Sequence, residues 1–294
     1  MNYSKFKVWI EATRPKTLAA GFVPVLIGTV MAAYEDYFNL TIFILTSICA
    51  ILIQVITNFV NEVYDFKKGV DNPNRLGPRR AVASGLIQSE MMIKVIKVMF
   101  IITLLLGMIL VFVSGGLVIF IIGVLSLAFA FFYSGGPYPL AYKGISDIFV
   151  LIFFGIIAVT GTYYLQAQKL TLEIFIASLA PGFLSMNILG VNNIRDIETD
   201  KNAGKITLAI LLGERASKFL YVFLNLLAFL VPLVLFQITK NIYFLSPLLV
   251  FPISIYLCIQ LFNSSGKKLN KILAQTGGLL FLYGISTLTL LLTK

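Results

Sequence analysis

Long apolar segments recur along this chain, and they limit its fold more than any other feature. A helix needs about 20 mostly apolar residues to cross a bilayer. We count nine segments of that kind, at 17–34, 40–61, 93–113, 115–134, 145–165, 172–192, 218–238, 242–262 and 275–292. Apolar residues make up 59% of the chain, charged residues 12%, and the mean hydropathy is +0.93, unlike a soluble domain. The sequence therefore predicts an all-α, polytopic membrane protein, with nine transmembrane helices bundled into a single domain over residues 1–294.

The basic residues sort to one side of this predicted bundle. Lys and Arg that flank membrane helices stay on the cytoplasmic side. With the N-terminus inside, all 23 Lys and Arg residues fall in cytoplasmic segments except Lys169, Lys240 and Lys294. We therefore expect a multi-pass protein of the cell membrane, whose N-terminus and long loops, 66–91 and 193–217, face the cytoplasm. This sorting accounts for the net charge of +10, so nucleic acid is not expected as a partner.

Histidine and cysteine usage removes several kinds of site. The chain has no histidine, and its two cysteines, Cys49 and Cys258, lie inside apolar segments. A histidine–zinc site, a histidine-ligated haem and a Ser-His-Asp triad are excluded. No disulfide framework is indicated either. Any metal must be held by oxygen ligands.

Two clusters rich in Asn and Asp stand where apolar segments end. Their members are Asn58, Asn61, Asp65 and Asp71 at and beyond the end of the second segment, and Asn192, Arg195, Asp196, Asp200 and Lys201 at and beyond the end of the sixth. The spacing puts the residues from Gln54 to Asp65 on one helix face, and Asn192, Asp196 and Asp200 on another. An Asp inside a span costs about 3 kcal/mol, so these faces are expected to meet a wet interior. A single Asn could simply bond a neighbouring helix, but the two stripes together favour a site.

The two clusters end helices that run the same way and are four helices apart. This spacing suggests a pseudo-repeat over about 17–134 and 145–262. Parallel repeats place their shared site at the interface between them, so we expect the clusters to face one central cavity open to the cytoplasmic side. Coincidence of two polar helix ends is the alternative.

Facing carboxylates with basic residues around them suit a divalent cation and a diphosphate. Mg²⁺ is held by one or two carboxylates together with waters and substrate phosphates. We expect Asp65, Asp71, Asp196 and Asp200 to hold Mg²⁺ through the diphosphate, with Asn61 and Asn192 adding or orienting ligands. Arg79, Arg80, Lys143, Arg195 and Lys201 would neutralise phosphate oxygens, and Asn58 would face the substrate. Such a site stabilises a leaving diphosphate, and the lipid-facing half of the cavity suits an isoprenoid tail.

Six motifs link the chain to a known family. They are 13–17 (TRPKT), 61–71 (NEVYDFKKGVD), 77–85 (GPRRAVASG), 135–142 (GGPYPLAY), 161–164 (GTYY) and 192–201 (NNIRDIETDK). At these motifs the chain resembles the UbiA superfamily of intramembrane prenyltransferases, over residues 13 to about 216. Two features depart from the family pattern, because Glu62 stands where Asp is expected and Gly69 stands where the ubiquinone branch has a second Asp. The spacing of Asp65 and Asp71 resembles the naphthoate branch.

The resemblance implies a fold and a reaction. It implies nine helices with Asp-rich motifs on the second and sixth, and it assigns Asp65, Asp71, Asp196 and Asp200 to the metal–diphosphate site with Asn61 and Asn192 as flanking amides. It also places Arg14, Arg80, Tyr138 and Lys143 near the substrates. The implied reaction is transfer of a polyprenyl group from polyprenyl diphosphate to 1,4-dihydroxy-2-naphthoate, as in menaquinone biosynthesis, with loss of the carboxylate.

Other functions stay open from the sequence. Within the same superfamily the acceptor could be 4-hydroxybenzoate, homogentisate, haem or an ether-lipid glycerol phosphate. A secondary transporter is the rival from another class, since transporters also show repeats and polar residues within spans. The oligomeric state is not predicted.

Overall fold

The computed structural model of the chain describes residues 5–71 and 76–293; Lys294, counted above, lies outside these ranges. Within these ranges all regular secondary structure is helical, apart from one isolated backbone bridge between Lys143 and Ile206. The predicted all-α class is therefore confirmed.

The α-helices follow one another along the chain, and the long connection between the third and the fourth carries the segment 77–85. They are α1 (Lys5–Ala12), α2 (Ala19–Tyr34), α3 (Leu40–Lys67), α4 (Ser89–Leu110), α5 (Gly116–Phe132), α6 (Ser146–Val150), α7 (Ala158–Ala167), α8 (Leu172–Arg195), α9 (Ile197–Asn202), α10 (Leu208–Leu212), α11 (Glu214–Thr239), α12 (Phe251–Phe262) and α13 (Leu269–Ser286). Two π-helical segments are η2 (Val111–Gly115) and η4 (Leu151–Ile157). The 3₁₀ segments are η1 (Pro15–Thr17), η3 (Leu140–Tyr142), η5 (Ile242–Val250), η6 (Gly266–Lys268) and η7 (Thr287–Thr293).

Seven helices of the described residues are long and apolar enough to cross a membrane. They are Leu40–Lys67, Ser89–Ser114, Ser146–Ala167, Leu172–Arg195, Glu214–Thr239, Ile242–Phe262 and Gly266–Leu292. An eighth span is formed if Lys5–Thr17 and Ala19–Tyr34, which meet at a bend of 54°, are counted as one. The segment predicted at 115–134 contains α5, an apolar helix of 17 residues. The chain is thus a multi-pass membrane protein, with seven or eight candidate spans where the sequence predicts nine.

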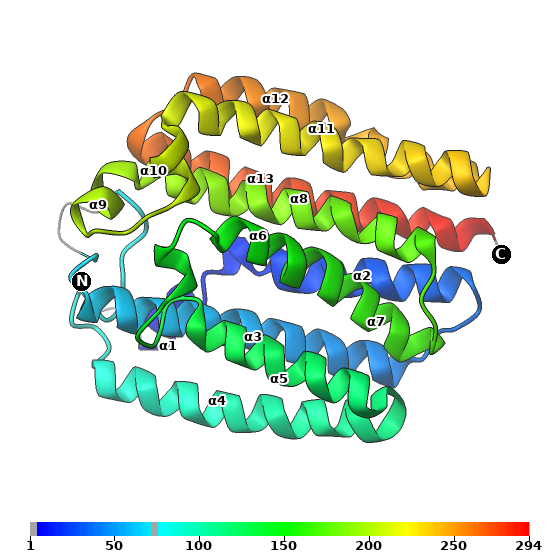
Figure 1. Cartoon of the computed structure of the whole chain (residues 1–294), viewed down its shortest axis with the longest axis horizontal. Coiled ribbons are helices and arrows are strands. Elements are labelled where there is room, and N and C mark those ends of the chain that lie inside the picture. Colours follow the sequence, from blue (N-terminus) through cyan, green and yellow to red (C-terminus); the bar gives the residue numbers. More distant parts are fainter. Residues whose placement is uncertain (1–4, 72–75, 294) are drawn as a thin grey trace.

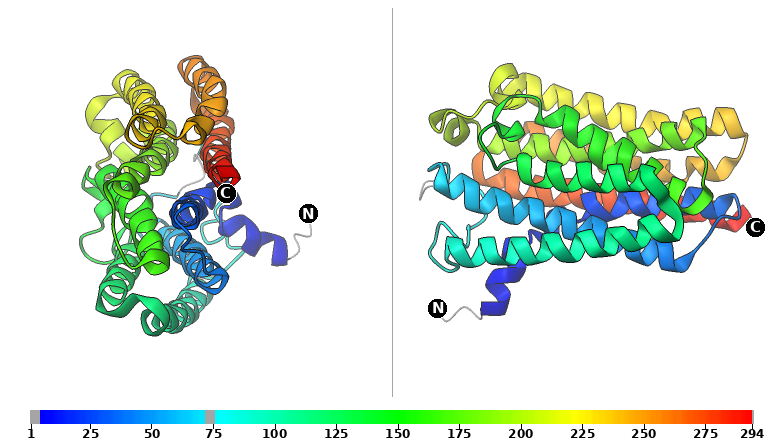
Figure 2. Two further views of the ribbon diagram at one scale, coloured as in Figure 1. Left: turned by 90° about the vertical axis from the view of Figure 1, so that its right-hand side faces the viewer. Right: turned by 60° about the horizontal axis from the view of Figure 1, so that its bottom comes forward.

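The long helices lie side by side along the long axis of the molecule (Figure 1). The short helices α9 and α10 cover one end of the bundle, and α1 projects from the body near the same end (Figure 2). The C-terminal ends of α3 and α8, which carry the two acidic clusters, both lie toward this end (Figure 1). The fold therefore brings together clusters that are more than 100 residues apart in the chain.

Both cluster-bearing helices begin at a polar cap. The Asn39 side chain accepts a hydrogen bond from the backbone N–H of Ile42 at the start of α3, and the Thr171 side chain accepts one from Ile174 at the start of α8. Such caps satisfy backbone N–H groups that have no partner in the first turn. Each long helix thus runs from a capped end to an acidic end.

Helix α2 packs closely against its neighbours because small residues stand at the contacts. A Cβ atom at Gly28 would lie 2.5 Å from the Val159 carbonyl oxygen of α7, and one at Gly284 of α13 would lie 2.6 Å from Val23. On a third side, a Cβ at Gly21 would lie 3.2 Å from the Ala50 carbonyl oxygen of α3. Glycines allow membrane helices to approach at this range.

The opposite end of the bundle is tied together by polar side chains. Oε2 of Glu35, just after α2, accepts a hydrogen bond from the Tyr163 hydroxyl at 2.7 Å and lies 2.7 Å from Nζ of Lys169. The Asn39 backbone and the Gln166 side chain exchange two hydrogen bonds, of 2.7 and 3.1 Å. These contacts join α2, α3 and α7 at the end away from the acidic clusters.

Candidate active site

A polar pocket lies between the ends of α3 and α8. Its lining includes Asn58, Asn61 and Asp65 from the first cluster, Asn192, Asp196 and Asp200 from the second, and the basic residues Arg14, Arg80 and Lys205. Gln54 lines it too, so the whole predicted face of α3 points into the pocket. Three carboxylates, drawn from both clusters, thus line the same pocket as three cationic side chains.

Asn61 organises the first half of this pocket through both ends of its amide. Its Oδ1 accepts hydrogen bonds from the guanidinium groups of Arg14 and of Arg80, the latter at 3.1 Å. Its Nδ2 donates to Oδ2 of Asp65 at 2.8 Å and to the Ser134 hydroxyl at 3.0 Å. Asn61 therefore holds two cations beside a carboxylate, and its carbonyl oxygen is engaged by arginines in this structure.

Arg14 reaches the pocket from a strained turn. Its φ of 55° lies in the left-handed region. For a residue other than glycine, this backbone conformation costs about 1–3 kcal/mol. Nδ2 of Asn58 donates to the Thr13 carbonyl oxygen at 2.9 Å, and the Thr17 hydroxyl donates to the Arg14 carbonyl oxygen at 3.0 Å. Asn58 thus helps to fix the backbone that presents Arg14.

Tyr142 holds the other oxygen of Asp65. Its hydroxyl donates to Oδ1 at 2.7 Å, and Nζ of Lys68 and Nζ of Lys205 lie 4.1 and 5.5 Å from the centre of its ring. Burial, followed by the negative charge of Asp65, raises the pKa of Tyr142. Burial also lowers the pKa of Lys68. Tyr142 therefore stays protonated as a donor to Asp65.

Asp71 lies behind the pocket lining, in the loop that follows α3. It is buried, and its Oδ2 lies 3.3 Å from Nε of Arg80, an ion pair without hydrogen-bond geometry. Nη2 of Arg80 lies 4.0 Å from Oδ2 of Asp65. Arg80 thus bridges the two carboxylates of the first cluster.

Glu62, which departs from the family pattern, lies on α3 and contacts the loop that follows this helix. Its side chain is 1% exposed, and Oε1 accepts a hydrogen bond from the backbone N–H of Val82 at 3.1 Å. A carboxylate at this position therefore anchors the segment 77–85 that carries Arg80.

The second cluster does not continue one helix. Helix α8 ends at Arg195, and α9 begins after Asp196, whose φ and ψ are −101° and 10°. The expectation that Asn192, Asp196 and Asp200 share one continuous helix face is wrong, because the chain turns at Asp196. All three nevertheless line the pocket.

Arg195 is buried among side chains of the protein. Its guanidinium donates to Oδ1 and Oδ2 of Asp196 at 2.8 and 2.5 Å, to Oδ1 of Asn192 at 2.8 Å and to Oδ1 of Asn270 on α13 at 2.8 Å. Nδ2 of Asn270 in turn donates to the Leu76 carbonyl oxygen at 2.9 Å. Arg195 thus orients the second cluster and links it, through Asn270, to the loop after the first.

Asp200 presents an oxygen that suits a hard cation. Its Oδ1 lies 3.4 Å from Nζ of Lys205, while its Oδ2 is buried and makes no hydrogen bond within the described part of the chain. Burial raises the pKa of Asp200 to about 6, Lys205 opposes that shift, and Asp196 and Asp65 add to it. Among residues 5–71 and 76–293, no group of three His, Cys, Asp or Glu side chains could hold a metal ion by itself. The carboxylates fit Mg²⁺ only when phosphate oxygens complete the coordination.

Several residues expected at the site lie apart from this pocket. Tyr138 is 75% exposed, with its ring 5.7 Å from Nζ of Lys143, and Lys143 and Lys201 are exposed as well. Tyr133, which the sequence offers among several tyrosines that could position an aromatic acceptor, does line the pocket, and so does Lys205, which the sequence did not single out for it. Lys205 follows Gly204, whose φ is 67°, so a turn signal before a lysine was the only indication available.

The comparison with protein families decides the class of this site. A model described as the UbiA prenyltransferase family matches residues 21–285. The chain belongs to the UbiA prenyltransferase family. It is therefore a prenyltransferase, and the transporter considered from the sequence is not retained.

Comparisons with individual proteins support this family assignment. The chain is 36% identical over 216 residues to the 1,4-dihydroxy-2-naphthoate octaprenyltransferase of Escherichia coli (strain K12), covering 72% of this chain and 70% of the relative. The enzyme of that name from Haemophilus influenzae is 36% identical over 225 residues, covering 72% and 71%. A UbiA homologue from Archaeoglobus fulgidus, solved with DMAPP and Mg²⁺, has the same fold, with a TM-score of 0.67, 14% identity and coverage of 96% and 99%.

Proposed function

We propose that this prenyltransferase joins a polyprenyl group to 1,4-dihydroxy-2-naphthoate, a step of menaquinone biosynthesis, with Mg²⁺ as cofactor. The proposal rests above all on one observation: Asp65, Asp196 and Asp200 line a single pocket together with Arg14, Arg80 and Lys205. The names of the Escherichia coli and Haemophilus influenzae relatives support the choice of acceptor.

The reaction balances without a protein nucleophile. The bond between the allylic carbon and the diphosphate oxygen breaks, and the diphosphate leaves with the electron pair. The ring carbon that bears the carboxylate then attacks the allylic cation and forms the new carbon–carbon bond. Carbon dioxide departs from that carbon, and the electron pair of its bond restores the aromatic ring.

The polar residues of the pocket would hold the leaving group. Asp65, Asp196 and Asp200, with Asn61 and Asn192 beside them, would hold Mg²⁺ against the diphosphate. Asp71, expected from the sequence to share this role, would act through Arg80, with which it pairs. When bound, Mg²⁺ would neutralise negative charge that develops on the departing diphosphate. Arg14, Arg80 and Lys205 are placed to donate to phosphate oxygens, and such donors stabilise charge most in a buried site.

Four residues expected near the substrates are assigned lesser roles. Tyr138, Lys143 and Lys201 are exposed, so a direct role would require the covering loops to close over the substrate. Arg195 is assigned to orienting Asp196 and Asn192, because its donors are already engaged.

The arrangement in the membrane follows from the charges. We propose nine spans, in which α5 is added to the eight spans described above. We also propose that the N-terminus and the acidic clusters lie on the cytoplasmic side, and that the central cavity opens to that side. The similar course of α3 and α8, each from a polar cap to an acidic end, supports a pseudo-repeat of 17–134 and 145–262.

An acceptor panel tests the proposal. Purified protein, radiolabelled polyprenyl diphosphate and Mg²⁺ are incubated with 1,4-dihydroxy-2-naphthoate, 4-hydroxybenzoate, homogentisate, haem or a glycerol phosphate ether lipid in turn. We expect a decarboxylated, prenylated naphthalene and one equivalent of diphosphate. Product with another acceptor alone would overturn the naphthoate assignment.

A further inference from the structure

Two serines line the polar pocket in addition to its charged residues. Ser146 stands at the start of α6 and Ser185 lies within α8, and both line the pocket that holds Asp65 and Asp196. Only 1% of Ser146 and 3% of Ser185 is exposed. The proposed reaction uses neither serine to hold Mg²⁺ or the diphosphate. Their hydroxyl groups are therefore available to the other substrate, the aromatic acceptor.

The Ser185 hydroxyl has unused hydrogen-bonding capacity. Its Oγ is buried and makes no hydrogen bond within residues 5–71 and 76–293. By contrast, the hydroxyl of Ser178, a buried serine of the same helix, donates to the Phe175 carbonyl oxygen at 2.6 Å. A buried hydroxyl without a partner destabilises the folded protein. Ser185 thus offers a donor and an acceptor to a polar group that enters the pocket.

Asp147 fixes the orientation of the Ser146 hydroxyl. Ser146 Oγ donates to Oδ2 of Asp147 at 3.2 Å, and Asp147 is itself buried. Asp147 also lines a small cavity together with Asn187 and Asn193, and no Lys or Arg of the described residues lines that cavity. A buried carboxylate without a cation depends on the hydrogen bonds that it receives. The Ser146 hydrogen is therefore committed to Asp147, and the Ser146 oxygen is left to accept a hydrogen bond.

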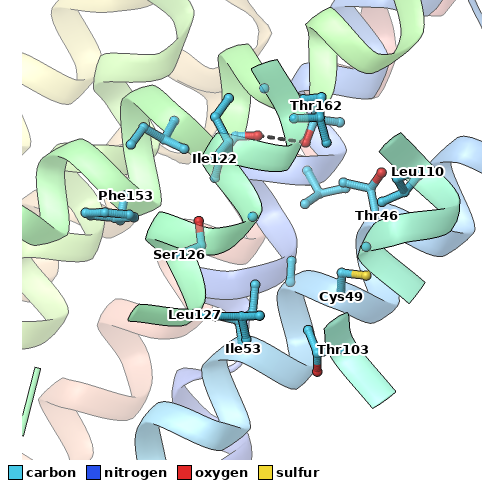
Figure 3. A pocket seen from close by; sticks show the side chains of 18 of the residues that line it. Thr46, Cys49, Ile53, Thr103, Leu110, Ile122, Ser126, Leu127, Phe153 and Thr162 are labelled. Carbon is cyan, nitrogen blue, oxygen red and sulfur yellow. Dashed lines mark hydrogen bonds between the residues drawn. The ribbon is translucent and has the colours of Figure 1, made fainter. Parts of the chain in front are cut away.

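Apolar side chains of the same two stretches of chain line the pocket with the serines. They are Val150 and Phe154 after Ser146, and Ile188 and Leu189 after Ser185. Phe154 also lines the adjoining apolar pocket, of which Figure 3 shows the part around Leu127 and Phe153. This part of the polar pocket thus combines hydroxyl groups with apolar surface, which suits an aromatic ring that carries hydroxyl groups.

A close backbone contact holds the two serine-bearing stretches together. A Cβ atom at Gly155 of η4 would lie 2.7 Å from Cα of Gly182 on α8, and 2.8 Å from the Ser178 carbonyl oxygen. Glycines allow membrane helices to approach this closely. Because η4 continues directly from α6, and Gly182 precedes Ser185 by one turn, this contact fixes the position of Ser146 relative to Ser185.

We propose that Ser146 and Ser185 bind the two hydroxyl groups of the aromatic acceptor and so select an acceptor with hydroxyls para to each other. This inference rests on the proposed function. Ser146 accepts a hydrogen bond from the 1-hydroxyl group of 1,4-dihydroxy-2-naphthoate, and Ser185 pairs with the 4-hydroxyl group. Asp147 is a positioning residue that keeps the Ser146 hydrogen away from the substrate. The 1-hydroxyl group is ortho to the attacking ring carbon, so the hydrogen bond that it donates raises the electron density on that carbon.

An acceptor that lacks one hydroxyl group tests the role of Ser185. Calorimetry with Mg²⁺ and an unreactive prenyl diphosphate analogue gives the Kd of 1,4-dihydroxy-2-naphthoate and of 1-hydroxy-2-naphthoate. We expect the native protein to bind the dihydroxy acid at least about tenfold more tightly, because the other acid leaves Ser185 unpaired. In Ser185→Ala the ratio should fall below about threefold. Ser178→Ala is the matched control, since Ser178 does not line the polar pocket, and it should keep the native ratio.

Steady-state kinetics with 1,4-dihydroxy-2-naphthoate test Ser146 and Asp147. Ser146→Ala and Asp147→Asn should each lower kcat at least about tenfold, because the hydrogen bond to the 1-hydroxyl group strengthens as the ring carbon attacks. Ser146→Thr keeps the hydroxyl and should recover most of kcat. Both acids carry the 1-hydroxyl group, so Ser146→Ala should leave the ratio of their Kd values unchanged. A general loss of structure would not lower kcat and preserve that ratio.

The outcomes separate this inference from the proposed function. A native protein that prenylates 1,4-dihydroxy-2-naphthoate but binds both acids equally overturns the role of the serines and leaves the reaction standing. A Ser185→Ala protein that keeps the native ratio, or a Ser146→Ala protein that keeps the native kcat, overturns it as well. Failure of the native protein to prenylate 1,4-dihydroxy-2-naphthoate overturns the reaction itself. If Asp147→Asn does not fold, the two serine variants still decide.

Discussion

The Tyr142 hydroxyl donates to Oδ1 of Asp65 at 2.7 Å, which ties the loop after α5 to the acidic end of α3. A hydrogen bond to a charged group contributes about 1.5–3 kcal/mol, and 1.36 kcal/mol corresponds to about tenfold in rate. Tyr142→Phe should therefore lower kcat/KM by roughly 10- to 100-fold by leaving Asp65 poorly oriented. Steady-state kinetics at saturating Mg²⁺ measure this. Tyr256→Phe, on the exposed face of α12, is the control, and equal activity of the two variants would contradict the role.

Asp65→Asn and Asp196→Asn should each abolish transfer while the protein remains folded in the membrane. The amide keeps the volume of the side chain but removes the charge that Mg²⁺ requires. Product formation and the elution of the protein in detergent are measured together. Lys67→Ala, an exposed residue beside Tyr64 at the end of α3, should have a mild effect. Mg²⁺-dependent turnover in the Asp65→Asn or the Asp196→Asn protein would contradict the proposed site.

Removal of divalent metal should stop the reaction reversibly. The described residues lack a group of three His, Cys, Asp or Glu able to hold a metal, so the ion is expected to depend on the donor diphosphate for its ligands. We therefore expect Mg²⁺ to bind weakly to the protein alone and tightly with the diphosphate present. Calorimetry with and without a non-hydrolysable prenyl diphosphate analogue measures both states. Equal affinity in the two would count against shared coordination.

Arg195 should matter for stability as well as activity. Removing one partner of a buried ion pair costs about 3–5 kcal/mol, so Arg195→Ala should lower the free energy of unfolding by that amount. Arg215→Ala, at an exposed position, is the control. The double variant Arg195→Met with Asp196→Leu should recover much of the stability without recovering activity. Chemical denaturation in detergent measures the free energy of unfolding of each variant. An Arg195→Ala protein as stable as the native protein would contradict the orienting role.

Cysteine labelling in membranes tests the orientation. With Cys49 and Cys258 replaced by alanine, a cysteine at position 79 should react with a membrane-impermeant maleimide only after the cytoplasmic face is exposed. A cysteine at position 240 should react from the outside of intact cells. The reverse pattern would invert the proposed topology.

The broad architecture and half of the site could be predicted because they depend on local patterns. Apolar length predicts spans wherever a helix is long enough, and it is least decisive at α5, which is apolar but has only 17 residues. The spacing from Gln54 to Asp65 predicts a shared face because α3 is regular to Lys67. The same helical spacing wrongly predicts a shared face from Asn192 to Asp200, because α8 ends at Arg195 and the chain turns at Asp196.

The roles of individual polar residues depend on packing that spacing does not encode. Arg195 has the charge expected of a phosphate ligand, yet Asn270 from α13 helps to enclose it, and nothing near Arg195 in sequence indicates that contact. Tyr138 and Tyr142 belong to one motif, and only the turn between them decides that Tyr142 reaches Asp65 while Tyr138 is exposed.

The close contacts of α2 at Gly21, Gly28 and Gly284 have a mechanical consequence. Close contacts with α3, α7 and α13 surround α2 on three sides. Helix α2 is therefore held in a fixed position relative to these three helices. A Cβ atom at any of these glycines would come too close to atoms of a neighbouring helix, so a larger side chain there would have to push α2 and its neighbour apart.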